Sequence, residues 1–112
     1  LNDAPHHVAV FCEKDPAQGR GLGRSTMPET TTWSAVMAIH TFWLAAVAAE
    51  VGLGWVSILD PDAVHHALDA EDGWEFVAYL CVGYPLEPPL PPELERTGWE
   101  QRTPERRLWL TP

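Results

Sequence analysis

The stretch WSAVMAIHTFWLAAVAAE, residues 33–50, decides the fold. It is rich in Ala and predicts a helix from Trp33 to Glu50, with Gly52 as its stop. Its apolar side chains fall on nearly every face, which indicates a helix surrounded by protein, in a domain centre or a subunit interface. Polar residues such as His40 interrupt the run, so a buried helix fits better than a membrane span and we expect no membrane partner.

The residues before this helix predict a strand and a long loop. VAVFC is β-branched and aromatic, so His7 to Cys12 is expected to form a strand. The loop that follows, residues 13–32, contains three Gly and two Pro. Its last residues, together with Ser34, supply several candidate N-caps for the helix.

The residues after the helix predict a strand, a short helix and a second strand. Gly52-Leu53-Gly54 is read as a tight reversal that leads into the strand WVSIL. Asp60-Pro61 is a helix-start signature, with Asp60 as the cap of a helix that extends to about Leu68. The segment Trp74–Val82 is apolar almost throughout, which predicts a central strand.

The composition changes at Pro85. Residues 85–112 hold seven of the 11 prolines, which excludes a long helix or a central strand and predicts an extended arm. The expected anchors of this arm are large apolar residues: Leu86, Leu90, Trp99, Leu108 and Trp109. The order of elements indicates an α+β or α/β sandwich whose small sheet cannot cover the apolar helix. We therefore expect part of a larger protein or one subunit of an intertwined oligomer.

Charge and composition exclude several classes of protein. The chain has 16 acidic and 7 basic residues, for a formal charge of −9, which argues against a nucleic-acid binder. Cys12 and Cys81 lie in apolar runs and form no zinc spacing, so we expect two buried strand thiols. The five His complete no ligand set, so no metal site is predicted. The N-terminus shows no signal peptide, which favours a cytoplasmic location.

Three features are candidates for binding or chemistry. The segment Gly19–Arg24 resembles a phosphate loop, but it matches no full motif and we favour a solvated loop. Ser57 follows the Gly-Leu-Gly segment without the surroundings of a hydrolase nucleophile, so its alternatives are a structural serine and a ligand contact. Arg102 is either an exposed arm residue or a phosphate clamp delivered by the arm.

Several strings in order carry a family resemblance: VAVFC, GLGR, TMPET, the Ser-led helix, GWVSILDP, VAYLCVGYP and PELERTGW. Together they resemble the C-terminal half of the 5,6-dimethylbenzimidazole synthases, a flavin-destroying branch of the nitroreductase-like flavoproteins. The resemblance extends from about Ala4 to Arg102, with GWVSILDP and AYLCVGYP as its most specific parts.

The resemblance implies an α+β nitroreductase-like sandwich, here partial, that forms an intertwined homodimer. Residues 1–84 would be the partial core and residues 85–112 the Pro-rich C-terminal arm, which wraps the partner subunit. The helix from Ser34 to Ala49 would belong to the dimer core, in agreement with its all-round apolar character.

The resemblance also implies a chemistry. Reduced flavin mononucleotide (FMN) reacts with dioxygen and is fragmented to 5,6-dimethylbenzimidazole, the lower ligand of cobalamin, with release of erythrose 4-phosphate. The family's serine near the flavin maps onto Ser57, as a group that orients or relays a proton. Leu53 and Gly54 would lie near the isoalloxazine, and Arg102 would approach the phosphate. A separate flavin reductase is a candidate partner for supplying reduced flavin.

Departures from the family pattern leave alternatives open. The family's Arg-rich phosphate motif and its essential acidic residue are absent, and Leu1 stands where a complete chain has Met, so we expect a fragment. His40-Thr41 replaces the usual Gln-Asn, and Glu100 stands where Arg is common. The alternatives are a generic FMN-dependent nitroreductase-type oxidoreductase and an inactive remnant or dimerisation module.

Overall fold

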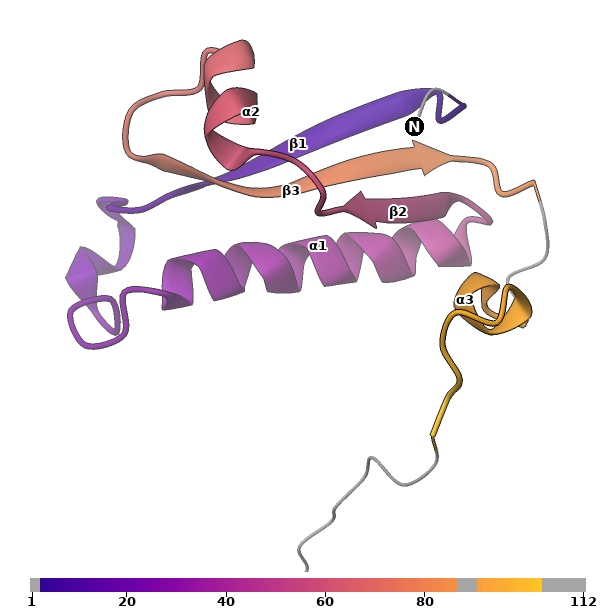
Figure 1. Cartoon of the computed structure of the whole chain (residues 1–112). Coiled ribbons are helices and arrows are strands. Elements are labelled where there is room, and N and C mark those ends of the chain that lie inside the picture. Colours follow the sequence, from indigo (N-terminus) through magenta and orange to yellow (C-terminus); the bar gives the residue numbers. More distant parts are fainter. Residues whose placement is uncertain (1–2, 87–90, 104–112) are drawn as a thin grey trace, which may run out of the picture.

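A computed structural model of the chain describes residues 3–86 and 91–103 (Figure 1). A short 3-10 turn at Gln18–Gly21 lies in the first long loop. The strands and helices are β1 (His6–Glu13), α1 (Thr30–Ala48), β2 (Gly52–Val56), α2 (Pro61–Ala67), β3 (Trp74–Gly83) and α3 (Glu93–Arg96). Mixed helix and sheet confirm the predicted α+β class.

The three strands form an antiparallel sheet in the order β1-β3-β2. The predicted central position of the most apolar strand is confirmed, because β3 pairs with both neighbours. Leu80 lies opposite Val8 on β1 and Trp55 on β2. Ala78 and Leu80 are each only 1% exposed, so the centre of the core lies on β3.

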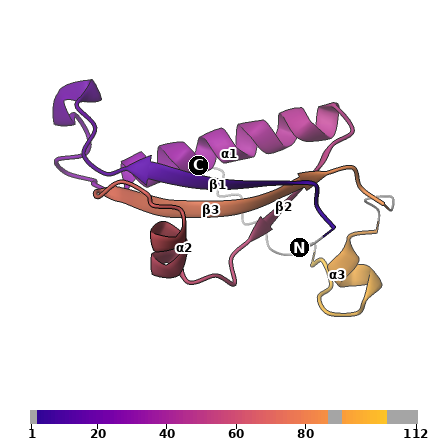
Figure 2. The same ribbon diagram turned by 90° about the horizontal axis from the view of Figure 1, so that it is seen from above.

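The helices α1 and α2 lie on opposite sides of the sheet (Figures 1 and 2). Ile39 of α1 packs against Leu53, Ala78 and Leu80 to form the buried cluster. On the other side, the ring of His65 in α2 meets Phe11 edge-on, with 5.9 Å between centroids. The fold therefore has three layers, helix, sheet and helix. Of the two helices, only α1 adds a residue to the buried cluster.

The ends of α1 differ from the prediction. The helix begins at Thr30 rather than Trp33, and its N-cap, Glu29, makes no side-chain capping bond. The expected threonine caps are wrong, because the hydroxyls of Thr30 and Thr31 donate backward to carbonyl oxygens in the preceding turn. The left-handed residue after the helix is Glu50, with φ 60°, so Gly52 does not act as its stop.

The Gly-Leu-Gly segment forms the start of β2 and not a reversal. Gly52 and Gly54 pair directly with Gly83 and Cys81 of β3. A Cβ on Gly52 would lie 3.2 Å from the carbonyl oxygen of Gly83, so the glycine allows the two backbones to approach closely. The predicted strand therefore starts three residues early and ends at Val56, which leaves Ser57 just beyond it.

The start of α2 agrees with the prediction from the sequence. The Asp60 carboxylate accepts hydrogen bonds from the backbone N–H groups of Asp62 and Ala63, at 3.0 and 3.3 Å. Pro61 occupies the first helical position, where its missing N–H costs nothing. The predicted cap is confirmed.

Most of α1 lacks a cover in this chain. Ile39 and Ala46 are its only buried residues, whereas Met37 is 70% exposed. By length and composition α1 is also apolar enough to cross a membrane, a test that core helices of soluble proteins pass as well. The prediction that protein surrounds this helix is not met within one chain. Its large exposed apolar residues are Trp33, Val36, Met37, Phe42, Leu44 and Val47.

The described part of the arm contains one helical turn where we predicted extended chain. This turn is α3, and it contacts no other helix or strand among the described residues. Leu86 and Trp99 are exposed, at 95% and 82%, so they do not anchor the arm on this chain. The other expected anchors, Leu90, Leu108 and Trp109, lie outside the described residues.

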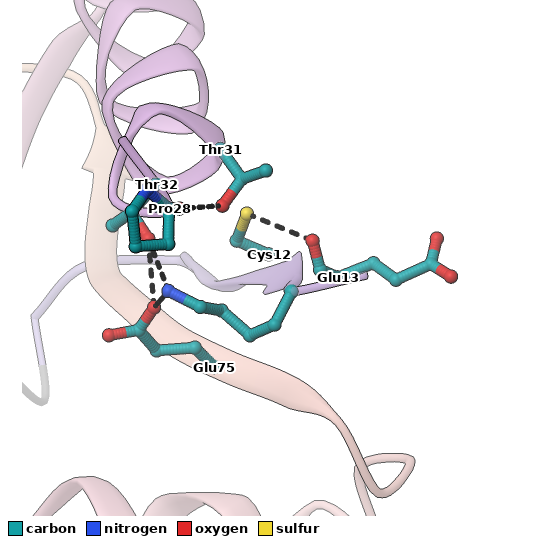
Figure 3. A network of polar contacts seen from close by, with 7 residues as sticks. Cys12, Glu13, Pro28, Thr31, Thr32 and Glu75 are labelled. Atoms are coloured by element: carbon teal, nitrogen blue, oxygen red, sulfur yellow. Dashed lines mark hydrogen bonds and ion pairs between the residues drawn. The ribbon is translucent and has the colours of Figure 1, made fainter. Parts of the chain in front are cut away.

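A polar triangle ties the start of α1 to the sheet (Figure 3). The Nζ of Lys14 lies 2.5 Å from Oε2 of Glu75 and 3.1 Å from Oγ1 of Thr32. The Thr32 hydroxyl donates to the same Glu75 oxygen at 2.8 Å. These hydrogen bonds, that from Lys14 foremost, hold the pKa of Glu75 below its ordinary value of 4.5.

We expect this triangle to make folding sensitive to acid. Because the pKa of Glu75 is lowered in the folded state, its stabilisation is present above the unfolded value near 4.5 and is lost as the pH falls through the folded value. Denaturant unfolding at a series of pH values below 5 should show a shallower loss of stability for Glu75→Gln than for the natural sequence. Glu13→Gln is the control, since that carboxylate makes no ion pair among the described residues. Equal slopes for all three proteins would contradict the prediction.

Candidate functional site

Ser57 lies at the end of β2 with its hydroxyl exposed. It directly follows Val56, the last residue of the strand, and precedes Ile58, which is 88% exposed. No residue among positions 3–86 and 91–103 takes up its hydroxyl in a hydrogen bond. The side chain is therefore free to contact a ligand, which is one of the two alternatives that the sequence left open.

The backbone of β2 offers polar groups beside Ser57. Within the described sheet, β2 is an edge strand, so its outer N–H and C=O groups have no strand partner. The Leu53 side chain is buried in the core, so only its backbone can meet a ligand. No atom would lie within 4 Å of a Cβ placed on Gly54, so open space lies over this residue.

These residues fit the ring of a flavin. The edge of an isoalloxazine carries alternating hydrogen-bond donors and acceptors, and a strand edge presents alternating backbone groups of both kinds. A flat ring also needs a surface without projecting side chains, which Gly54 supplies. The predicted residues Leu53 and Gly54 lie in β2, and Ser57 directly follows its last residue.

Sequence reasoning missed a row of polar side chains that crosses the sheet next to Gly54. Cys81 pairs with Gly54 on one side and with His7 on the other, so all three share one face. The Cys81 sulfur lies 3.8 Å from Nδ1 of His7, whose ring lies 5.5 Å from that of Tyr79. The alternation of VAYLCVG carries the signal: the buried Ala78 and Leu80 face α1, so Tyr79 and Cys81 face away from it.

Arg102 lies apart from this group. Its Nε and Nη2 donate to the two carboxylate oxygens of Glu95, at 2.5 and 3.0 Å. This pairing raises the pKa of Arg102 and lowers that of Glu95. In Figure 1, α3 lies beyond the end of the sheet at which β2 begins, whereas Ser57 follows the opposite end of β2. One copy of the chain does not bring Arg102 together with Ser57.

The two arginines of the Gly-rich loop differ in their partners. Arg24 donates to the Pro16 carbonyl at 2.7 Å and pairs with Asp15 at 2.6 Å, so it closes the loop on itself. Arg20 sits in the left-handed region, with φ 50°, and has no partner in the described part of the chain. No helix begins directly after this turn, which supports the interpretation as a solvated loop.

Comparison with known proteins identifies the family of the folded core. The sequence pattern of the nitroreductase family matches residues 1–84, which contain the whole sheet, α1, α2 and Ser57.

Individual relatives extend the match into the arm. A 5,6-dimethylbenzimidazole synthase of Rhodospirillum rubrum is 58% identical over 104 residues, which cover 93% of this chain and 49% of the relative. Two proteins of the same name from Rhodobacter capsulatus are 51% and 44% identical over 110 residues, or 96% of this chain and 53% of each relative. The chain thus spans about half the length of the curated relatives it matches. The matched core, with its antiparallel sheet and its apolar helix, places the chain in the nitroreductase family.

Proposed function

We propose that the protein carrying this chain is a 5,6-dimethylbenzimidazole synthase, which fragments reduced FMN with dioxygen. The observation that carries the proposal is identity of 44–58% to three proteins of that name over nearly the whole chain. FMN is then the substrate, and its reduced ring supplies the electrons for the reaction with dioxygen. The products include 5,6-dimethylbenzimidazole and erythrose 4-phosphate, and the pyrimidine part of the ring leaves as a separate fragment.

The residues of this chain would hold the ring and move protons beside it. The outer backbone groups of Leu53 and Gly54 would bind the edge of the ring and set its plane. The Ser57 hydroxyl would orient the reacting part of the ring or relay a proton to it, since no side chain in the described residues competes for it. Arg102 would neutralise the phosphate.

A second copy of the chain is the proposed cover of α1. The exposed apolar side chains of α1 would be buried by another apolar surface. In a twofold dimer, the α1 helices of the two copies would pack against each other and bury both surfaces. A homodimer would also let the arm of one subunit deliver Arg102 to the partner's β2. The remaining expectations are a cytoplasmic location and a separate source of reduced flavin.

The dimer predicts a specific effect of charge on α1. Leu44→Glu should convert the dimer to monomer in analytical ultracentrifugation, because it would bury an unpaired carboxylate at the interface. Leu68→Glu is the matched control, since Leu44 and Leu68 are 59% and 52% exposed but Leu68 lies next to α2 on the other side of the sheet. A dimer that survives Leu44→Glu, or that dissociates equally with Leu68→Glu, would contradict the predicted interface.

The activity can be tested directly. The purified full-length protein, supplied with reduced FMN and air, should yield 5,6-dimethylbenzimidazole that is detected by its mass. Flavin that survives turnover with a reduced nicotinamide donor would indicate the generic oxidoreductase instead. No flavin binding at all would indicate the remnant or dimerisation module.

Ser57→Gly should separate binding from chemistry. FMN should still bind, while product formation should fall by about 100-fold, the usual scale for losing a proton-transfer group. Ser25→Gly is the control, because it removes an exposed hydroxyl from the Gly-rich loop. An unchanged rate for Ser57→Gly would remove this residue from the mechanism.

A further inference from the structure

Glu95 makes three hydrogen bonds to one residue. Its Oε1 accepts from the backbone N–H of Arg102 at 3.1 Å and from Nε at 2.5 Å. Its Oε2 accepts from Nη2 at 3.0 Å. The same carboxylate thus fixes both the main chain and the side chain of Arg102. An ordinary surface ion pair joins two flexible side chains and orders neither of them as well.

The two partners differ in exposure. The Glu95 side chain is 17% exposed and the Arg102 side chain 70%. The carboxylate therefore lies beneath the guanidinium, which faces solvent. The Nε–Nη2 edge is used by Glu95, whereas Nη1 and the second proton of Nη2 have no partner in the part of the chain that is described. This distal edge has the fork geometry that binds two oxygens of a phosphate.

The local fold supports this orientation. After α3, the N–H groups of Trp99 and Glu100 both donate to the Leu94 carbonyl, and Gly98 has φ 74°. The chain thereby turns back toward α3, which brings Arg102 beside Glu95. A cleft of about 410 Å³ runs along this turn, and its lining includes Arg102 and three carboxylates, those of Glu93, Glu95 and Glu100. Of these three, only Glu95 holds Arg102 in the hydrogen bonds described above.

We infer that Glu95 is a positioning residue: it fixes Arg102 so that the distal edge of the guanidinium is presented to the phosphate of FMN. This inference rests on the proposed function and adds a residue to its phosphate site. An arginine that is ordered before binding loses less conformational freedom when the phosphate arrives. The bound carboxylate also leaves Arg102 able to hold a second anion on its other edge.

The experiment compares FMN with riboflavin, which lacks the phosphate, by titration calorimetry of the full-length protein. Glu95→Gln should weaken FMN binding about tenfold, the scale of one side chain that must be ordered on binding, and should leave riboflavin binding unchanged. Arg102→Ala should show the same selectivity with a larger loss. Glu100→Gln is the matched control, because it removes the same charge from the same turn and should not weaken FMN binding.

Four outcomes would overturn the inference: no effect of Glu95→Gln on FMN binding, equal losses for both flavins, tighter FMN binding in Glu95→Gln, or a natural protein that does not prefer FMN over riboflavin. Tighter binding would mean that Glu95 competes with the phosphate for Arg102. Glu95→Asp, with its retained charge and shorter reach, replaces Glu95→Gln if the latter fails to fold. If the natural protein forms 5,6-dimethylbenzimidazole but Glu95→Gln has no effect on FMN binding, only the inference about Glu95 fails. If the selectivity is as expected but no 5,6-dimethylbenzimidazole forms, only the proposed function fails.

Discussion

The contact between α1 and the central strand β3 organises the whole chain. Ile39 meets Ala78 and Leu80 there, and the remaining core residues gather around this contact. The contact covers only one stripe of a helix that is apolar on every face. Full burial of a large aliphatic side chain contributes about 1.5–3 kcal/mol, so the uncovered residues of α1 represent much stabilisation that one chain does not realise. Covering this helix is therefore the strongest physical reason for an interface.

The packing of α1 on the sheet also determines which side of β2 is exposed at the candidate site. The strand β2 follows α1 after a short turn, and Leu53 is buried because it packs with Ile39 in the core. With the Leu53 side chain held inside, Gly54 must face the opposite side of the sheet, and the strand ends so that Ser57 is exposed. The core therefore determines which surface of β2 is available to a ligand. Cys81 and His7 share that surface for the same reason.

Much of the fold could be predicted because local signals and tertiary packing agree. The apolar β3, the Asp60-Pro61 cap and the Ala-rich helix each have a strong local cause; β3 and the cap lie where they were expected, and the helix differs only at its ends. The Gly-Leu-Gly segment was misread because glycine permits both a turn and a close strand pairing, and only the neighbour, Gly83, decides between them. The turn at α3 was missed because a Pro-rich composition outweighed the short helical segment ELER. For the site, the residues along β2 come from the family resemblance and stay a prediction, whereas the cross-strand row could not be predicted from the sequence, since it depends on register.

Because the chain is acidic, the phosphate is the part of the proposed ligand that is hardest to bind. With a formal charge of −9, the overall field repels a phosphate, so binding depends on a local cation. Arg24 is committed to Asp15 and Pro16, whereas Arg102 keeps one edge of its guanidinium open despite its bond to Glu95. A bidentate contact at short range depends less on the global field than a long-range attraction does, because salt screens charges beyond about 8–10 Å. An arginine held in place by its own acidic neighbour is therefore compatible with an acidic chain that binds a phosphorylated ligand.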